Sequence, residues 1–228
     1  MRFIYKLKKI ILMNIVFIFS FITISDDDSF EKDKDTNQIQ YSFKIENENV
    51  EDKEEEILEN MSSLIIKKDG EVSDSYISLA NNYFEKIPEN LRNILINEGW
   101  NIYITDKNLA KEFFAGSYKK VAGVTIYDKK TIYIEARSSA IKTSLIHEVG
   151  HALDSTKGFI SNKRSFKVVY KNEQDTFIEV GNEESDYGIS SGSEYFAETF
   201  NQFVLYPEQQ KTNTPKTYEY MENLVKIS

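Results

Sequence analysis

The sequence contains no cysteine in its 228 residues. The chain therefore forms no disulfide bond, and a lipid has no cysteine thiol to which it could be attached after export. A metal ion finds no thiolate either, so any metal site must use nitrogen or oxygen ligands. The stability of the fold must come from its hydrophobic core and from a metal, if one binds.

Histidine is almost as scarce, because the chain has only His147 and His151. A separation of four residues places both imidazoles on one face of an α-helix, one turn apart, where they can share one metal ion. Glu148 follows the first histidine, which gives the H-E-x-x-H arrangement of zinc peptidases. On such a helix this glutamate lies beside the pair, where it can hold a water molecule as a general base.

Long apolar runs are also missing, apart from residues 10–24, which follow four basic residues in the first nine positions. This combination is typical of a secretion signal, and Thr23 and Ser25 fit a small-x-small cleavage site. We therefore expect residues 1–25 to be a signal peptide and the mature protein to be secreted and extracellular. The alternative is an uncleaved membrane anchor on a tethered structural protein, for which the run is slightly short.

The chain has no surplus of basic residues, because its net charge is −9. Most of this charge lies in residues 26–60, which hold 14 acidic and 4 basic residues and few large apolar ones. We therefore expect residues 26–70 to be an acidic linker or pro-segment. No basic patch elsewhere favours binding to DNA or RNA, so we expect no nucleic-acid partner.

Residues 71–228 carry the patterns of a folded domain. Apolar residues recur at helical spacing over residues 76–87 and again from Pro88 to Gly99, a typical helix-ending residue. A strand is predicted for residues 100–105.

A hairpin of residues 121–127 and 130–135 follows, and after it comes the helix that carries the histidines. Ser138 or Ser139 can cap the start of this helix, and Gly158 can end it. A small sheet that precedes a zinc-binding helix predicts a zincin-like α+β fold that is mainly helical. The sheet edge beside the site can receive an extended peptide.

A catalytic zinc site needs a third protein ligand, and here it must be a carboxylate. Glu194 and Glu198 lie one turn apart on a predicted helix that is rich in aromatic residues. Burying two carboxylates is costly unless a cation compensates them. This favours Glu194 as the third ligand and Glu198 as the acceptor of an imidazole N–H. The alternatives are a capping box of Ser191 with Glu194, and an exposed helix position for Glu198.

Asp154 lies three residues after His151 on the same predicted helix. It is either a second acceptor for a ligating imidazole or an ordinary aspartate on the helix surface. The sequence leaves both interpretations open.

Three blocks of the sequence resemble, in order and spacing, the catalytic domain of anthrax lethal factor and its relatives. These relatives include the secreted Pro-Pro endopeptidases of Gram-positive bacteria. The three blocks are residues 147–154, 187–200 and 214–221. The resemblance implies that Glu194 is a zinc ligand, that Tyr187 helps to stabilise the transition state, and that the last block belongs to a closing helix.

The motif and the resemblance together predict a secreted zinc metalloendopeptidase of the gluzincin type. In this interpretation His147, His151 and Glu194 bind one Zn²⁺ per chain, and Glu148 and Tyr187 are catalytic. The expected substrate is an extended peptide or protein, and we expect a monomer that is free of the membrane once the signal is removed. The alternative is a non-enzymatic interaction module that retains the fold, as in degenerate copies within toxins of this family.

Overall fold

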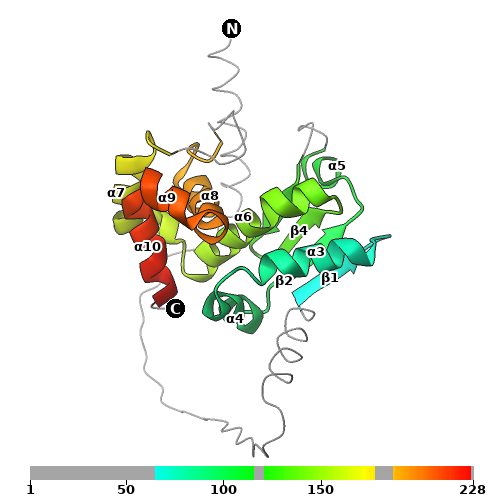
Figure 1. Ribbon diagram of the computed structural model, residues 1–228. Coiled ribbons are helices and arrows are strands. Elements are labelled where there is room, and N and C mark those ends of the chain that lie inside the picture. The colour runs from blue at the N-terminus through cyan, green and yellow to red at the C-terminus, as the bar shows by residue number, and fades with distance from the viewer. Residues whose placement is uncertain (1–64, 116–120, 178–186, 227–228) are drawn as a thin grey trace, which may run out of the picture. The chain divides into compact units, whose positions relative to one another are not determined.

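The structure, a computed structural model, describes residues 65–115, 121–177 and 187–226. The expected signal peptide and nearly all of the expected acidic segment lie outside these residues. Among the helices of the described part, none is long and apolar enough to cross a membrane. The elements, shown in Figure 1, are β1 (Ile66–Asp69), α3 (Asp74–Phe84), α4 (Glu89–Asn97), β2 (Asn101–Thr105), α5 (Leu109–Phe114), β3 (Gly123–Ile126), β4 (Thr131–Glu135), α6 (Ser138–Thr156), η1 (Ile160–Asn162), α7 (Arg164–Glu173), α8 (Gly192–Leu205), α9 (Pro207–Asn213) and α10 (Pro215–Lys226).

The strands form one sheet in the order β1-β2-β4-β3. β2 runs parallel to both of its neighbours, whereas β3 and β4 are antiparallel, which confirms the predicted hairpin. Ile102 and Ile104 of β2 are fully buried on one face, and Tyr103 between them stacks on Tyr133 on the other face. β3 is therefore an edge strand of the described sheet.

The folded part begins earlier than residue 71, the start expected from the sequence. β1 pairs in parallel with β2, and Ile65 and Ile66 are buried in the core. Because Lys67 and Lys68 are exposed and charged, the sequence of this short strand is as polar as that of the acidic segment before it. A four-residue strand with two exposed lysines shows too little alternation to be recognised alone.

The long helix α6 lies between the sheet and α8, as Figure 1 shows. The expectation that Ser138 or Ser139 caps this helix is wrong, because the N-cap is Arg137 and Ser138 is the first helical residue. Arg137 donates instead to Ser139 Oγ. The predicted end is confirmed, since the helix stops at Thr156 and Gly158 follows with a φ of +72°.

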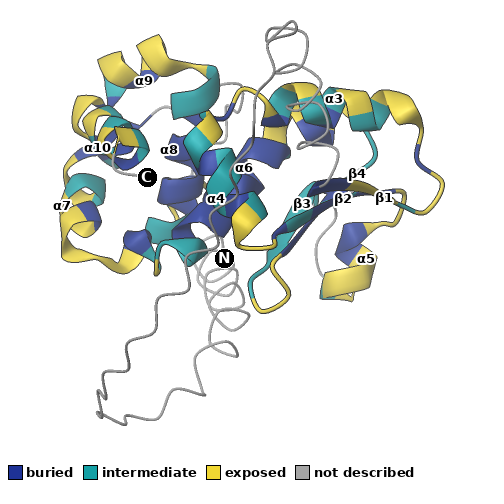
Figure 2. Cartoon of the chain, turned by 90° about the horizontal axis from the view of Figure 1, so that it is seen from below, coloured by how far each residue is buried: buried dark blue, intermediate teal, exposed yellow. Residues whose placement is uncertain are grey.

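Helices α6 and α8 cross in close contact, and their buried residues lie at the centre of Figure 2. A Cβ atom added to Gly150 of α6 would lie only 2.8 Å from the Cα of Ala197 in α8. A glycine facing an alanine thus lets the two backbones approach. This crossing brings the H-E-x-x-H segment next to the start of α8.

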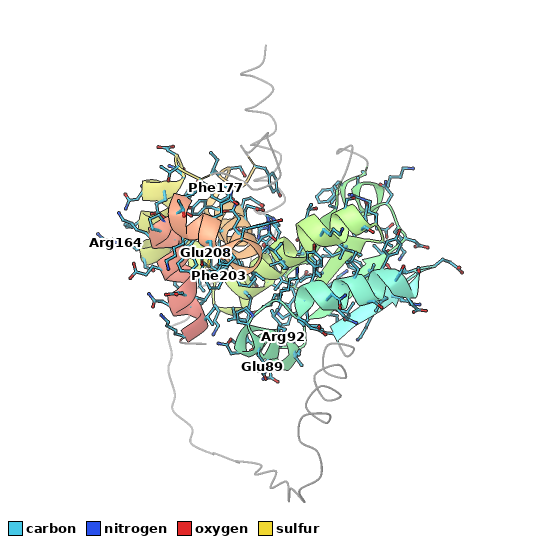
Figure 3. All side chains as sticks on the ribbon, in the orientation of Figure 1. Glu89, Arg92, Arg164, Phe177, Phe203 and Glu208 are labelled. Carbon is cyan, nitrogen blue, oxygen red and sulfur yellow. The ribbon has the colours of Figure 1, made fainter. Side chains whose placement is uncertain are left out.

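The C-terminal helices hold α8 from the other side. The buried carboxylate of Glu173, at the end of α7, accepts the backbone N–H groups of Lys216 and Thr217 and so binds the first turn of α10. Phe177, labelled in Figure 3, packs edge-on against Tyr195 of α8 with 5.3 Å between ring centres. The resulting α+β fold is mainly helical with a small sheet, as expected, and this sheet has four strands. Helix α10 lies where the resemblance implies a closing helix.

Candidate active site

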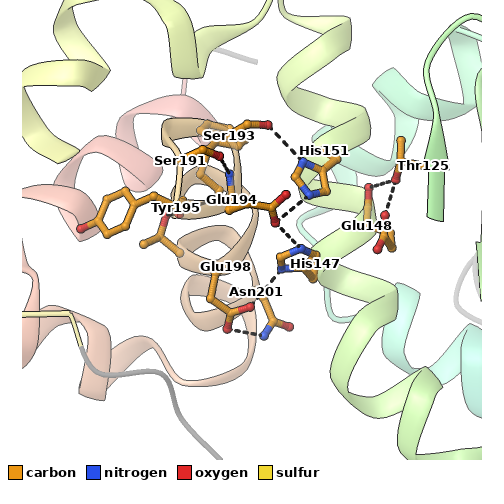
Figure 4. Close-up of polar contacts among 12 residues, drawn as sticks. Thr125, His147, Glu148, His151, Ser191, Ser193, Glu194, Tyr195, Glu198 and Asn201 are labelled. Carbon is orange, nitrogen blue, oxygen red and sulfur yellow. Dashed lines mark hydrogen bonds and ion pairs between the residues drawn. The ribbon is translucent and has the colours of Figure 1, made fainter. Parts of the chain in front are cut away.

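One turn of α6 presents both histidines to α8. His147 and His151 are buried, and their rings lie nearly perpendicular with centres 4.9 Å apart. Their Nε2 atoms converge on one carboxylate oxygen, Oε2 of Glu194, at 3.3 Å each. Figure 4 shows this convergence between the two helices.

Glu194 lies in the first turn of α8, and its backbone N–H and its carboxylate have separate roles. Its backbone N–H donates to Ser191 Oγ at 3.1 Å, so the helix cap that the sequence offered as an alternative does exist. The carboxylate, however, points at His147 and His151. The cap therefore fixes the start of α8 and leaves the carboxylate for the histidines.

This geometry fits a metal ion. One ligand atom from each of His147, His151 and Glu194 lies within 4.8 Å of the others, and all three residues are buried. Oε2 of Glu194 is also a buried oxygen without a hydrogen-bond partner. An orphaned carboxylate oxygen beside two imidazole nitrogens is the donor set of a zinc site with a position left for water.

The ionisable side chains of the site shift one another's pKa values. Burial lowers the pKa of His147, but its contacts with Glu194 and Glu198 outweigh burial and hold the pKa well above the ordinary value. Burial raises the pKa of Glu194, yet the imidazoles of His151 and His147 hold it below the usual range. Glu194 is therefore ionised at neutral pH, which is the form that binds a metal.

The second nitrogen of His147 is held by the next turn of α8. Glu198 Oε2 lies 3.0 Å from His147 Nδ1, and Asn201 donates to the other carboxylate oxygen at 3.2 Å. Glu198 is buried, so the alternative of an exposed helix position is wrong. When Nδ1–H donates to this carboxylate, Nε2, which faces Glu194, is the nitrogen that can bind a metal.

His151 has a different partner from the one that the sequence suggested. Its Nδ1 lies 3.3 Å from the hydroxyl of Ser193, a contact that sequence reasoning missed. Asp154 instead uses both oxygens on Ser161, from whose backbone N–H and hydroxyl it accepts. The carboxylate is buried rather than on the helix surface, and it anchors the loop after α6.

Glu148 faces the edge strand β3. The Thr125 hydroxyl donates to Glu148 Oε2 at 2.6 Å and also lies 3.1 Å from the Glu148 backbone oxygen. A Cβ atom on Gly123 would lie 2.7 Å from Glu148 Cγ, so only glycine leaves room for this side chain. Neither contact was expected from the sequence, which predicted a sheet edge beside the site but not the residues through which it contacts this turn of α6.

Tyr187 lies beside the other face of the site. Its ring centre is 6.1 Å from that of His147, and the side chain is 46% exposed. The structure therefore brings Tyr187 to the histidines together with Glu148, Glu194 and Glu198. A half-exposed phenol at this place can reach a bound substrate.

Comparisons with known proteins show what the chain is similar to. Lethal factor of Bacillus anthracis is 25% identical in an alignment 177 residues long, which covers 68% of this chain but only 22% of lethal factor. The chain thus spans less than a quarter of that relative. The structure of the Pro-Pro endopeptidase PPEP-2 from Paenibacillus alvei is similar, with a TM-score of 0.58 and 22% identity. That likeness covers 72% of this chain and 99% of the other, and it supports the fold.

A family model described as anthrax toxin lethal factor, N- and C-terminal domain, matches residues 44–224. The match includes the sheet, both helices of the site and α10. It also begins before the first described residue, Ile65. Because this match covers well over half of the chain, the protein belongs to the anthrax toxin lethal factor family.

Proposed function

We propose that this protein is a secreted zinc-dependent endopeptidase of the gluzincin type, with a zincin-like catalytic domain. The observation that carries this proposal is the buried Oε2 of Glu194, which has no hydrogen-bond partner and lies 3.3 Å from the Nε2 atoms of His147 and His151. A carboxylate in this position is costly to bury unless a cation compensates it. Two histidines and one glutamate are the ligand set of this type of peptidase.

In the proposed mechanism one zinc ion is held by His147, His151 and Glu194. When bound, zinc supplies Lewis-acid chemistry that acidifies a water molecule and polarises the scissile carbonyl. Glu148 accepts the proton of the attacking water and then delivers it to the leaving amine. Tyr187 donates its phenolic O–H to the carbonyl oxygen as negative charge develops on it.

The substrate in this proposal is an extended segment of an extracellular or host protein. β3 pairs only with β4 in the described sheet, and the Glu148 side chain lies directly against it. An extended peptide can add to such an edge through backbone hydrogen bonds and so place one carbonyl at the site. The name of the similar Paenibacillus alvei protein makes Pro-Pro bonds a sequence to test.

The deciding experiment is digestion of a peptide library that includes Pro-Pro sequences, read by mass spectrometry. Wild-type protein and Glu148→Gln are compared, and the zinc content of both is measured. We expect one zinc per chain in both, with turnover at least about 10³-fold lower in Glu148→Gln. Equal cleavage by the two proteins would rule out the mechanism. Stoichiometric zinc without cleavage by the wild type would instead indicate an interaction module.

Secretion is tested separately. We propose that export removes residues 1–25, so the mature chain found in culture medium starts at Asp26. N-terminal sequencing of the protein from the medium and from the membrane fraction measures this. Recovery only from membranes, with residues 1–25 still attached, would show an anchor instead.

A further inference from the structure

A second tyrosine, Tyr127, belongs to the side of the site where the outer nitrogen of His151, Nδ1, contacts a hydroxyl and not a carboxylate. Its hydroxyl is hydrogen-bonded to Ser193, and Ser193 Oγ lies 3.3 Å from His151 Nδ1. Tyr127, from the turn after β3, is thus joined through the first turn of α8 to a ligand on α6. The mechanism proposed above does not use this residue.

The two ligating histidines are supported unequally. His147 donates to the carboxylate of Glu198, which is a charged acceptor and is itself held by Asn201. The Nδ1 of His151 instead contacts the hydroxyl of Ser193, and a hydroxyl can rotate and present either its proton or a lone pair. A serine must therefore be held by another group if it is to accept steadily from an imidazole N–H.

Tyr127 can be that group, because its ring is held in place by its neighbours. Its ring packs edge-on against Phe159, with 5.7 Å between ring centres. Phe159 has a φ of +53°, a backbone conformation that bulky side chains rarely adopt, in the loop that follows α6. Its N–H donates to the backbone oxygen of Asp154 at 2.7 Å, which fixes this turn. The strained turn thus places a ring where it holds Tyr127.

The surroundings also keep the phenol protonated. Burial raises the pKa of Tyr127 above its ordinary value, and the nearby carboxylates of Glu148, Glu194 and Asp154 raise it further. The phenol therefore stays protonated, although its hydrogen bond with Ser193 acts to lower the pKa.

We propose that Tyr127 is a positioning residue that, by holding Ser193, orients the imidazole of His151 for metal binding. This inference rests on the proposed function only in taking His151 as a zinc ligand. Groups that hold the outer nitrogen of a ligating histidine fix its tautomer and direction and so raise metal affinity. Tyr127 acts through another residue and touches neither metal nor substrate in this proposal.

The test is a double-mutant cycle on zinc affinity, measured by competition with a chromophoric chelator. We expect Ser193→Ala to weaken zinc binding by about 10-fold. Tyr127→Phe should weaken it by a smaller factor of about 3-fold, because Tyr127 is one hydrogen bond further from His151 than Ser193 is. In the Ser193→Ala background, Tyr127→Phe should have no further effect. Ser193→Thr, which keeps the hydroxyl, should restore the affinity.

Tyr127→Phe keeps the ring against Phe159, and circular dichroism checks that each variant folds. Tyr133→Phe is the matched control, since this tyrosine lies on the neighbouring strand but stacks on Tyr103 and should bind zinc as the wild type does. Unchanged zinc affinity in Tyr127→Phe would overturn the proposal. Equal losses with and without Ser193 would also overturn it, because Tyr127 would then act independently. A wild type that binds zinc but cleaves no peptide contradicts only the proposed function.

Discussion

Tyr187 is 46% exposed, whereas His147, beside which its ring lies, is buried. An exposed phenol buries little surface, so removing its hydroxyl should cost little stability. If it donates to the developing oxyanion, Tyr187→Phe lowers kcat by about 10²-fold while zinc content stays at one per chain. Steady-state kinetics on a cleaved library peptide, together with metal analysis, measures both quantities.

Tyr206→Phe is the control for this prediction, because Tyr206 is similarly exposed at 42% and lies at the far end of α8. Its loss of a hydroxyl should leave kcat unchanged. A Tyr187→Phe variant as fast as the wild type would make Tyr187 a packing residue.

Thr125 holds the carboxylate of Glu148, the proposed general base, through one short hydrogen bond, 2.6 Å from its hydroxyl to Glu148 Oε2. Thr125→Val keeps the shape of the side chain and removes this donor. A hydrogen bond to a charged group contributes about 1.5–3 kcal/mol, so we expect kcat to fall by about 10-fold or more as Glu148 loses its fixed direction. KM should change little, since the edge of β3 keeps its backbone groups.

Thr125→Ser retains the hydroxyl and is expected to keep most of the activity. Parallel kcat and KM measurements on the two variants separate the hydroxyl from the methyl group. A slow serine variant together with a valine variant as fast as the wild type would show that the packing of the methyl group, and not the hydrogen bond, is responsible.

At the scale of elements, the site depends on how closely α6 approaches α8. A Cβ atom at position 150 would lie 2.8 Å from the Cα of Ala197, a backbone contact that cannot be relieved by a side-chain movement. Gly150→Ala should therefore push the helices apart and lower the free energy of unfolding by about 1–3 kcal/mol. Because the ligands lie on both helices, zinc affinity should fall as well.

Chemical denaturation and chelator competition measure these two effects on the same Gly150→Ala sample. Gly192→Ala is a milder comparison, as its added Cβ would lie 3.3 Å from the Ser161 backbone oxygen. Wild-type stability together with wild-type zinc affinity in Gly150→Ala would show that the two helices can separate without cost.

Elements that depend on neighbouring residues were predictable from the sequence. The spacing of apolar residues predicted α3 and α4, and two β-rich runs around a polar turn predicted the hairpin of β3 and β4. β1 was not predicted, because its pairing joins residues more than 30 positions apart and its lysines hide the pattern. The local pattern of residues does not show which distant strand a segment will pair with.

The residues of the site, too, were predictable from the sequence only where they depend on local spacing. The spacing of His147 and His151 is local, and the need for a third ligand limits the choice to carboxylates, which led to Glu194. Thr125 and Ser193 are two of many hydroxyl residues, and nothing in the sequence distinguishes them. Their roles arise only where β3, α6 and α8 meet.

In the described part of the molecule, α6 is the element on which the others converge. It packs on β3 and β4, on α3 and on α8, while α8 is held in turn by α9 and α10. The proposed zinc ligands lie on both sides of the contact between α6 and α8, so a bound metal would join the sheet side of the core to the C-terminal helices. With no cysteine in the chain, no disulfide bond can replace this connection.

Metal removal should therefore lower the thermal stability of the whole folded unit. A ligand that binds only the folded state at about 100 times its Kd stabilises that state by about 2.7 kcal/mol. For a domain of this size we expect the midpoint Tm to rise by about 5–10 °C on zinc addition and to fall again with a chelator. Differential scanning calorimetry of the zinc-free and zinc-loaded protein measures the change.

Two variants make this last prediction specific to the site. Glu148→Gln keeps all three ligands and should show the full rise in Tm, even though it is inactive. Glu194→Ala removes the oxygen that has no hydrogen-bond partner, so zinc should raise its Tm little or not at all. The same rise in both variants would place the stabilising zinc elsewhere on the chain. A rise only where His147, His151 and Glu194 are intact would mean that the site that is proposed to cut peptides also holds the two sides of the fold together.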